Sequence, residues 1–327
     1  MLFAYNHNKQ LVSVKHYSPE ETYYCPDCGD KLIFKQGVIK IPHFAHRKKI
    51  NCEGLSEGET QEHLQLKQLF WTSGHSSGES WQLEKPLPEL KQRPDLLYKR
   101  TAAEIQCSTL KIPRLIQRFE GYRTGGYQDW WLLGPNLWPK KNWSVLQKHF
   151  CAYNENNGIH LWLIDTNGIR LLSHIHRINQ HYFYAERRIP FQSMPLLDVY
   201  QMDSQRKLVF HPTYQEVQTR KQYLAAKLIA FDDTVKPLQQ FLYLERQHLL
   251  HLPDWMYWPS QYSFIYNDAC IIFRYLYSQS PEKPASVIHR FEQFCLSNKI
   301  DWYFPRIEKE EIWNGLLAET RRFILQH

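Results

Sequence analysis

Short hydrophobic segments separated by turn residues occupy the first part of the chain. Two pairs of such segments are residues 2–5 with 11–14 and residues 31–35 with 38–41. The polar segment 6–9 separates the first pair, and Gln36 and Gly37 separate the second. Apolar runs joined by polar or glycine-containing turns are typical of β-hairpins. The pattern therefore predicts two hairpins before residue 56.

The hydrophobic period then changes from strand-like to helical. Ser56 and Glu59 form the S-x-x-E capping pattern of a helix start, and Leu66, Leu69 and Phe70 follow at helical spacing. The next predicted elements are strands around 81–84, 95–98 and 103–107, a helix over about 115–123 and a strand over 130–133. The order helix, three strands, helix, strand is that of the core of a restriction-endonuclease-like domain.

The second half begins with strands and continues with helices. Residues 160–165 and 169–174 flank a Thr-Asn-Gly turn and are expected to extend the preceding sheet. Helical patterns follow at 214–231, 237–250, 268–278, 286–297 and 308–325. Aromatic residues are dense at 255–258 and 273–277, and they are assigned to the core rather than to a surface that stacks bases.

These patterns predict an α/β (α+β) fold class with three parts. The expected parts are a small N-terminal β-hairpin module (1–56), a restriction-endonuclease-like central domain (57–190) and a helical C-terminal domain (191–327). A chain of 327 residues is long for one domain, and 43% hydrophobic with 22% charged residues is typical of globular proteins.

Composition also bears on the compartment and on partners. No apolar run approaches the ~18 residues that span a bilayer, and the N-terminus lacks a signal-peptide pattern, so a cytoplasmic protein without a membrane span is expected. Seven cysteines with one close pair argue against a disulfide framework. Residues 1–150 hold 21 Lys and Arg against 15 Asp and Glu, whereas residues 151–327 hold 19 against 18. The basic excess therefore lies in the first half, where it suits a polyanionic substrate.

An acidic pair lies in the predicted central domain. Asp95 follows Pro94, and Glu104 lies in the strand that resumes after the polar turn 99–101. Because side chains alternate along a strand, Glu104 and Gln106 share one face. Two acids with a polar residue two positions after the second form the skeleton of the PD-(D/E)xK nucleases, with Gln106 where Lys is usual. The carboxylates are candidate ligands for Mg²⁺ or Mn²⁺, and Gln106 can orient an attacking water without supplying charge.

The spacing of Cys25 and Cys28 is typical of a zinc knuckle, in which two thiolates reach one tetrahedral ion from a tight turn. The remaining ligands must come from His43, His46 and Cys52, and the residues alone leave more than one combination open. A module with so little core is expected to need the metal to fold.

Basic residues recur on or beside the helix predicted after Gln106. They are Lys111, Arg114, Arg118 and Arg123, accompanied by Tyr122. The spacing predicts a cationic ridge next to the acids, which would position a DNA backbone rather than read bases.

The residues of the first half, taken in order, resemble the CoiA competence-protein family. The residues that carry the resemblance are Cys25, Cys28, His43, His46, Cys52, Glu62, His63, Lys67, Asp95, Glu104 to Cys107, Glu120 to Arg123 and Trp131 to Gly134. The resemblance covers the first half alone. It implies a zinc set of Cys25, Cys28, His46 and Cys52, with His43 as the alternative ligand.

The resemblance also gives roles to the first helix. Glu62 would complete the shell of the catalytic metal, and His63 and Lys67 would contact phosphate. Without the resemblance, Glu59, His63 and Lys67 would form an exposed polar stripe at i, i+4 spacing.

The function that the resemblance implies is DNA processing in natural transformation. The expected protein is a metal-dependent nuclease that acts on single-stranded or branched DNA beside a strand-exchange recombinase. The rival hypothesis is a binding protein that keeps the nuclease fold without cutting, which the uncharged Gln106 favours. A weaker third hypothesis is a scaffold whose C-terminal half recruits the recombinase.

Overall fold

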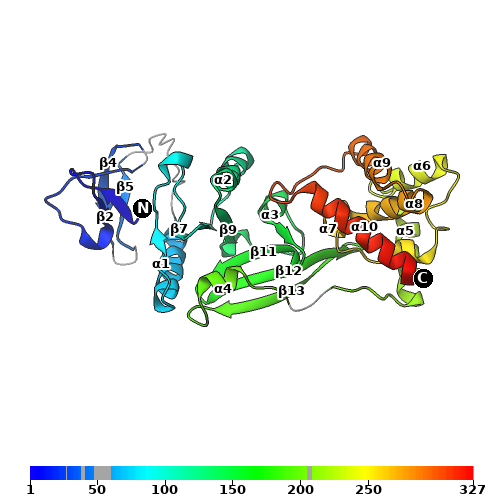
Figure 1. Cartoon of the computed structure of the whole chain (residues 1–327), viewed down its shortest axis with the longest axis horizontal. Coiled ribbons are helices and arrows are strands. Elements are labelled where there is room, and N and C mark those ends of the chain that lie inside the picture. Colours follow the sequence, from blue (N-terminus) through cyan, green and yellow to red (C-terminus); the bar gives the residue numbers. More distant parts are fainter. Residues whose placement is uncertain (27, 38–40, 48–59, 205–207, 327) are drawn as a thin grey trace. The chain divides into compact units, whose positions relative to one another are not determined.

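The computed structural model describes residues 1–26, 28–37, 41–47, 60–204 and 208–326 (Figure 1). The chain divides into two compact units. The first comprises Met1–Lys140, Trp162–Leu171 and Arg187–Met202, and the second comprises Lys141–Leu161, Leu172–Glu186 and Asp203–His327. In the described part of the chain, no helix is both long and apolar enough to cross a membrane.

The first unit begins with an antiparallel sheet, which has five strands among the described residues, in the order β2-β1-β3-β4-β5. The strands are β1 (Phe3–Tyr5), β2 (Leu11–Ser13), β3 (Tyr23–Tyr24), β4 (Lys31–Lys35) and β5 (His43–His46), and a 3-10 turn covers Val14–His16. Phe3 pairs with Ser13 and Tyr5 with Leu11, which confirms the first predicted hairpin. The short strand β3 was not predicted.

The partner of β4 differs from the prediction. Lys35 pairs with His43 and Leu32 with His46, so β4 pairs with β5 and not with the predicted strand 38–41, of which residues 38–40 lie outside the described residues. This register buries Phe44 beside Tyr23 in a small core of the N-terminal sheet. The prediction relied on a short turn at Gln36 and Gly37. The observed register instead has a longer connection between the two strands, and it buries the Phe44 ring.

The central sheet is mixed, and helices pack on it. Its strand order is β13-β12-β11-β9-β8-β7-β6, with β10 paired to β11. The strands are β6 (Gln82–Leu83), β7 (Leu96–Tyr98), β8 (Thr101–Gln106), β9 (Gln128–Leu133), β10 (Ala152–Asn154), β11 (Gly158–Asp165), β12 (Gly168–Ile178) and β13 (His181–Pro190). The remaining elements of the first unit are α1 (Gln61–Ser76), α2 (Ile112–Thr124), α4 (Leu196–Tyr200) and 3-10 turns over Pro88–Leu90 and Pro135–Leu137. Strands β8 and β9 are parallel, as are β9 and β11.

Helix α1 begins later than predicted. Thr60 is its N-cap, and the Thr60 Oγ1 atom accepts a hydrogen bond from the backbone N–H of His63 at 3.2 Å. The predicted cap residues Ser56 and Glu59 lie outside the described residues. The strands that were predicted on either side of the Thr-Asn-Gly turn are β11 and β12, and they extend the sheet as expected.

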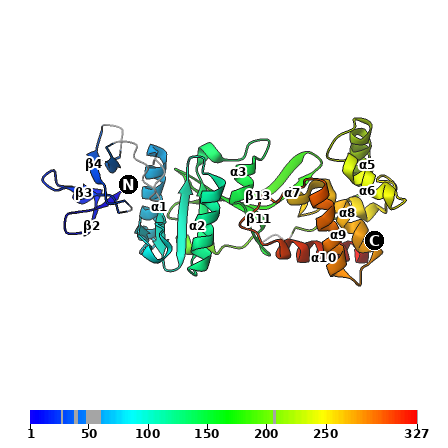
Figure 2. The same ribbon diagram turned by 90° about the horizontal axis from the view of Figure 1, so that it is seen from above.

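The two faces of β8 are covered by different helices (Figure 2). Ala103 and Ile105 belong to the core cluster that contains Phe70 of α1. Ala102 lies on the other face, in a cluster with Tyr122 of α2. Residues of β8 are therefore buried on both sides, and any polar side chain of this strand needs a partner within the protein.

The C-terminal region, which belongs to the second unit, is helical. The helices of this unit are α3 (Val145–Phe150), α5 (Tyr214–Ile229), α6 (Lys236–Leu244), α7 (Ser263–Tyr266), α8 (Cys270–Gln279), α9 (Pro284–Ser297) and α10 (Lys309–Gln326), with 3-10 turns over Asp254–Tyr257 and Asn267–Ala269. Helix α6 ends at Leu244 rather than near residue 250, and strand β13 was not predicted. The buried side chains of Trp255 and Phe273 confirm that the aromatic clusters belong to the core.

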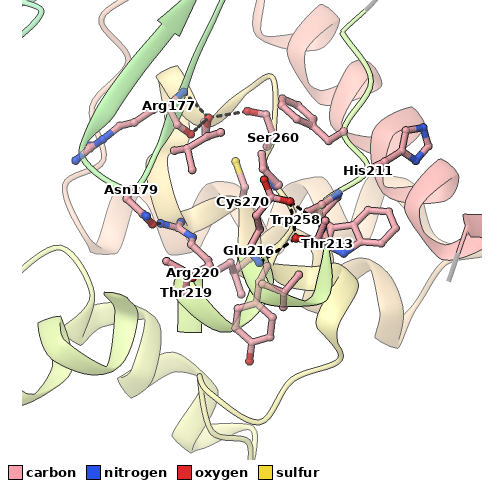
Figure 3. A pocket seen from close by; sticks show the side chains of 18 of the residues that line it. Arg177, Asn179, His211, Thr213, Glu216, Thr219, Arg220, Trp258, Ser260 and Cys270 are labelled. Atoms are coloured by element: carbon pink, nitrogen blue, oxygen red, sulfur yellow. Dashed lines mark hydrogen bonds between the residues drawn. The ribbon is translucent and has the colours of Figure 1, made fainter. Parts of the chain in front are cut away.

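The second unit contains a partly open pocket of about 390 Å³ (Figure 3). Thr213 and Glu216, at the start of α5, lie beside it and are hydrogen-bonded to each other at 2.9 Å. The buried Arg274 also lines it and pairs with Glu319 at 3.0 Å. The predicted acids and basic ridge lie in the first unit.

Candidate active site

Asp95 lies directly before β7 and is held by three groups. Its Oδ2 atom accepts a hydrogen bond from the backbone N–H of Ile105 at 2.9 Å. The Nε2 atom of His63 lies 2.9 Å from the same oxygen, and Lys67 Nζ lies 3.4 Å from Oδ1. The structure therefore brings two predicted residues of α1 to the first predicted acid.

Lys67 is fully buried, with 0% of its side chain exposed. The predicted exposed stripe is therefore wrong for this residue. Its ammonium pairs with Glu84, which follows β6 and is 2% exposed, as well as with Asp95. Two carboxylates around one ammonium satisfy a charge that could not otherwise be buried.

Sequence reasoning missed Glu84. The sequence did contain a sign that Lys67 is buried. Lys67, Phe70 and Gly74 are spaced by three and four residues, so they share one face of α1, and Phe70 makes that face apolar. Gly74 lies so close to the Trp81 ring that a Cβ atom there would collide with it. A lysine on such a face requires a buried acid as partner. Glu84 was a candidate, because it follows Trp81, which packs against α1, by three residues.

Glu104 is bound from the opposite face of the sheet. Its Oε1 atom accepts hydrogen bonds from Arg118 and from the hydroxyl of Tyr122, both on α2. Only 1% of Glu104 is exposed. Burial raises the pKa of Glu104 to about 7; Arg118 opposes the shift and the nearby charge of Asp95 adds to it.

The pKa of Asp95 moves in the other direction. Burial alone would raise it, but the positive charges of His63 and Lys67 hold the pKa of this carboxyl well below its usual range. The two acids thus differ in proton affinity, and the charge of Asp95 contributes to the raised pKa of Glu104. Such a separation is typical of functional carboxylate pairs.

Glu62 and Gln106 lie near the acids with other partners. Glu62 is half-buried, and its Oε2 atom accepts a hydrogen bond from Asn136 Nδ2 at 2.9 Å. Burial raises the pKa of Cys107 to about 12, and the charges of Glu62 and Asp95 add to the shift. Gln106 donates from Nε2 to the carbonyl of Ser108 at 2.8 Å.

The predicted cationic ridge is only partly exposed. Arg118 and Tyr122 are one turn apart on the face of α2 that covers β8, so their burial against Glu104 removes them from any outer ridge. Lys111 and Arg123 are exposed, and Arg114 is half-buried with Nη1 2.9 Å from Gln117 Oε1. Of the residues of the predicted ridge, only Lys111, Arg114 and Arg123 therefore retain exposed surface.

Cys25, Cys28 and His46 form a separate cluster in the N-terminal sheet. One ligand atom from each lies within 4.8 Å of the others, and Cys28 Sγ is 3.3 Å from His46 Nε2. His43 stands outside this cluster, with Nδ1 2.8 Å from the carbonyl of Ile41. Two thiolates and an imidazole fit zinc, and the predicted fourth ligand, Cys52, lies outside the described residues.

The acids of the central sheet fit a hard divalent cation in donor chemistry, because carboxylate oxygens are what Mg²⁺ and Mn²⁺ prefer. Asp95 and Glu104 would be the residues that hold it. Each acid already has side-chain partners, His63 and Lys67 for Asp95 and Arg118 for Glu104. Metal binding would therefore compete with these ion pairs.

Comparison with known proteins gives two matches to family models. The N-terminal domain of competence protein CoiA matches residues 5–54, and the nuclease-like domain of competence protein CoiA matches residues 59–204. The chain is also 32% identical over 116 residues to the protein named "Competence protein CoiA" of Bacillus subtilis (strain 168). That match covers 34% of this chain and 31% of the relative. No solved structure matches the chain.

The two family models follow each other in the chain in the same order as the cluster of Cys25, Cys28 and His46 and the two acids, and together they span more than half of the chain. The resemblance inferred from the ordered Cys, His and acidic residues is thereby confirmed. The chain belongs to the competence protein CoiA family, with the N-terminal and nuclease-like domains of that family.

Proposed function

We propose that this protein cleaves phosphodiester bonds of DNA in a reaction that depends on Mg²⁺ or Mn²⁺. The observation that carries the proposal is that the charge of Asp95, whose side chain is 15% exposed, acts on the buried carboxyl of Glu104, while the buried ammonium of Lys67 lies 3.4 Å from Asp95 Oδ1. Oxygen donors for a cation and a fixed positive charge near it are the groups that phosphodiester hydrolysis requires. The match to a nuclease-like domain family supports the same reaction class.

In the proposed reaction, Asp95 and Glu104 hold the ion, and Glu62 supplies a further carboxylate from α1. The bound ion would polarise the phosphodiester and lower the pKa of the attacking water. His63, which is 16% exposed, would face the phosphate, and the buried Lys67 ammonium would act through its charge beside Asp95 rather than by contact, in place of the lysine missing at position 106. Gln106 orients the water through its amide once it leaves the Ser108 carbonyl.

The proposed substrate is single-stranded or branched DNA. Lys111, Arg114 and Arg123 would position its backbone, since guanidinium and ammonium groups bind phosphate without reading sequence. We place this activity in natural transformation, in the cytoplasm and beside a strand-exchange recombinase, with the C-terminal part (191–327) as the contact region. The N-terminal module (1–56) would bind zinc through Cys25, Cys28, His46 and Cys52, and the nuclease domain would comprise residues 57–190.

A second candidate is a DNA-binding protein that retains the nuclease fold without cleavage. The observation that favours it is the ion pairing of both acids, since Arg118 engages Glu104 while His63 and Lys67 engage Asp95. If those pairs persist when DNA binds, the acids cannot hold a metal.

Incubation with labelled single-stranded, duplex and branched DNA, with and without Mg²⁺ or Mn²⁺, separates the two candidates. The proposal expects metal-dependent products from the wild type and none from Asp95→Asn. Tight DNA binding without cleavage under every metal would support the second candidate.

A further inference from the structure

Glu84 joins the N-terminal sheet to the acidic site. Its carboxylate accepts hydrogen bonds from the backbone N–H of Leu2, at 3.1 Å to each oxygen, and from that of Phe3 at 3.3 Å. The same carboxylate pairs with Lys67, whose Nζ also lies 3.4 Å from Asp95 Oδ1. An unbroken series of polar contacts thus runs from strand β1 to the proposed metal ligand.

The position of Glu84 is fixed from several directions. Its own N–H donates to the carbonyl of Asp95 at 2.9 Å. Its backbone lies in the left-handed region, with φ at +50°, which a residue with a side chain adopts only when its surroundings hold it there. Arg93 Nη1 lies 4.0 Å from Oε2. Such constraint is typical of residues that position functional groups rather than of surface acids.

Strand β1 is also held firmly on its other side. The backbone N–H of Phe44, on β5, donates to the carbonyl of Met1 at 2.9 Å, and the N–H of Val14 donates to that of Leu2 at 2.8 Å. The Leu2 side chain, 3% exposed, packs in the core cluster that contains Leu64 of α1. The two amides that bind Glu84 therefore belong to a segment that is itself hydrogen-bonded to neighbouring segments and packed in the core.

We propose that Glu84 is a positioning residue that holds the Lys67 ammonium against Asp95, with strand β1 as its support, so that the N-terminal sheet forms part of the acidic site. This inference rests on the proposed nuclease function for its effect on cleavage, but the contacts themselves can be tested without cleavage. Glu84 does not touch substrate in this account and acts through Lys67. No role for it follows from the PD-(D/E)xK skeleton.

The test compares Glu84→Gln, which removes the charge and keeps the shape, with Glu84→Asp, which keeps the charge, and with the exposed control Glu89→Gln. Acetylation of lysines with acetic anhydride, read by mass spectrometry, reports the accessibility of Lys67, and Lys148 in the second unit serves as an internal reference. Because local release exposes a buried group, Lys67 should be labelled about tenfold faster in Glu84→Gln. Lys148 should be unchanged, and Glu84→Asp should restore much of the protection.

A second measurement tests the hydrogen bonds between Glu84 and the amides of Leu2 and Phe3. Amide hydrogen exchange at Leu2 and Phe3 should accelerate in Glu84→Ala, while exchange at Phe44 should not. In DNA cleavage, Glu84→Gln should lower kcat about tenfold or more with little change in KM, as expected for a residue that acts only on the transition state.

The outcomes separate the two proposals. If the wild type does not cleave DNA but Glu84→Gln releases Lys67, the positioning role stands and the nuclease function falls. Unchanged labelling of Lys67 in Glu84→Gln would overturn the inference, as would equal acceleration at Lys67 and Lys148, which would indicate general unfolding.

Discussion

The Nζ atom of Lys67 lies 3.4 Å from Oδ1 of Asp95. The two residues come from different elements, α1 and the segment before β7, and the contact places a buried positive charge beside the first acid. Gln106, at the position where the PD-(D/E)xK skeleton carries lysine, has no charge and hydrogen-bonds Ser108. Helix α1 therefore brings to this site the cation that the sequence motif lacks.

Replacing Lys67 should affect both stability and activity. In Lys67→Met the packing volume is nearly kept, but Glu84 and Asp95 lose their shared ammonium inside the protein. Because an uncompensated buried charge is costly, the free energy of unfolding should fall by about 3–5 kcal/mol. Denaturant unfolding measures the change, with the exposed Lys85→Met as control. A loss no larger than that of the control would contradict the buried ion pairs.

Metal binding should depend on pH through Glu104. The pKa of this carboxyl is raised from 4.5 to about 7, so the folded protein holds a proton there at pH 6 that a cation must displace. The apparent affinity for Mn²⁺ should therefore rise with pH, by up to about tenfold between pH 6 and 7. Titration calorimetry at several pH values measures it. Retention of the pH dependence in Glu104→Gln would assign it to another group.

The raised pKa of Glu104 also determines how its contribution to the free energy of unfolding changes with pH. Between pH 4.5 and about 7 the folded state binds more protons at Glu104 than the unfolded state does. The contribution of Glu104 to stability should therefore be largest below pH 4.5 and decline as pH rises toward 7. Denaturant unfolding of the wild type and of Glu104→Gln at several pH values between 4.5 and 7 measures this contribution. The excess in the free energy of unfolding of the wild type over the variant should shrink or change sign near pH 7.

The Cys25, Cys28 and His46 cluster should hold one zinc ion per chain. Cys28→Ser removes one thiolate, so zinc should be lost and the small core of the N-terminal sheet should loosen. Elemental analysis of protein purified without chelator measures the metal, and Cys295→Ser, in the second unit, should keep it. Absence of zinc from the wild type would end the prediction.

DNA affinity should depend on the exposed cations near α2. The double variant Lys111→Gln with Arg123→Gln should weaken binding to all sequences alike and reduce the salt dependence by about one unit of slope per lost phosphate contact. Binding isotherms at several salt concentrations measure it. Lys283→Gln with Lys299→Gln, exposed in the second unit, is the matched control. Equal losses in both double variants would argue against a localised DNA surface.

The order of elements was largely predictable, because the hydrophobic period changes wherever a strand gives way to a helix. Asp95 and Glu104 could be selected as candidate site residues from the strand pattern around them. The partners of these acids were not predictable in the same way. Glu84 reaches Lys67 only because Leu83 pairs with Leu96, a long-range register that no local pattern encodes.

The face of α2 was also misjudged for a physical reason. Arg118 and Tyr122 are polar, and a periodic polar face normally indicates solvent exposure. Here β8 presents a buried carboxylate at Glu104, which makes an inward-facing Arg and Tyr favourable. Burial of one acid in the sheet thus determines the orientation of the helix that covers it.

The most direct test of the account is cleavage of one labelled branched DNA by the wild type, Glu104→Gln and the exposed control Glu89→Gln, each with and without Mn²⁺. The account predicts metal-dependent products from the wild type and Glu89→Gln, and none from Glu104→Gln although it binds the DNA at least as well. Products from Glu104→Gln at the wild-type rate, or no products from the wild type with Mn²⁺, would contradict a metal-dependent site at Asp95 and Glu104.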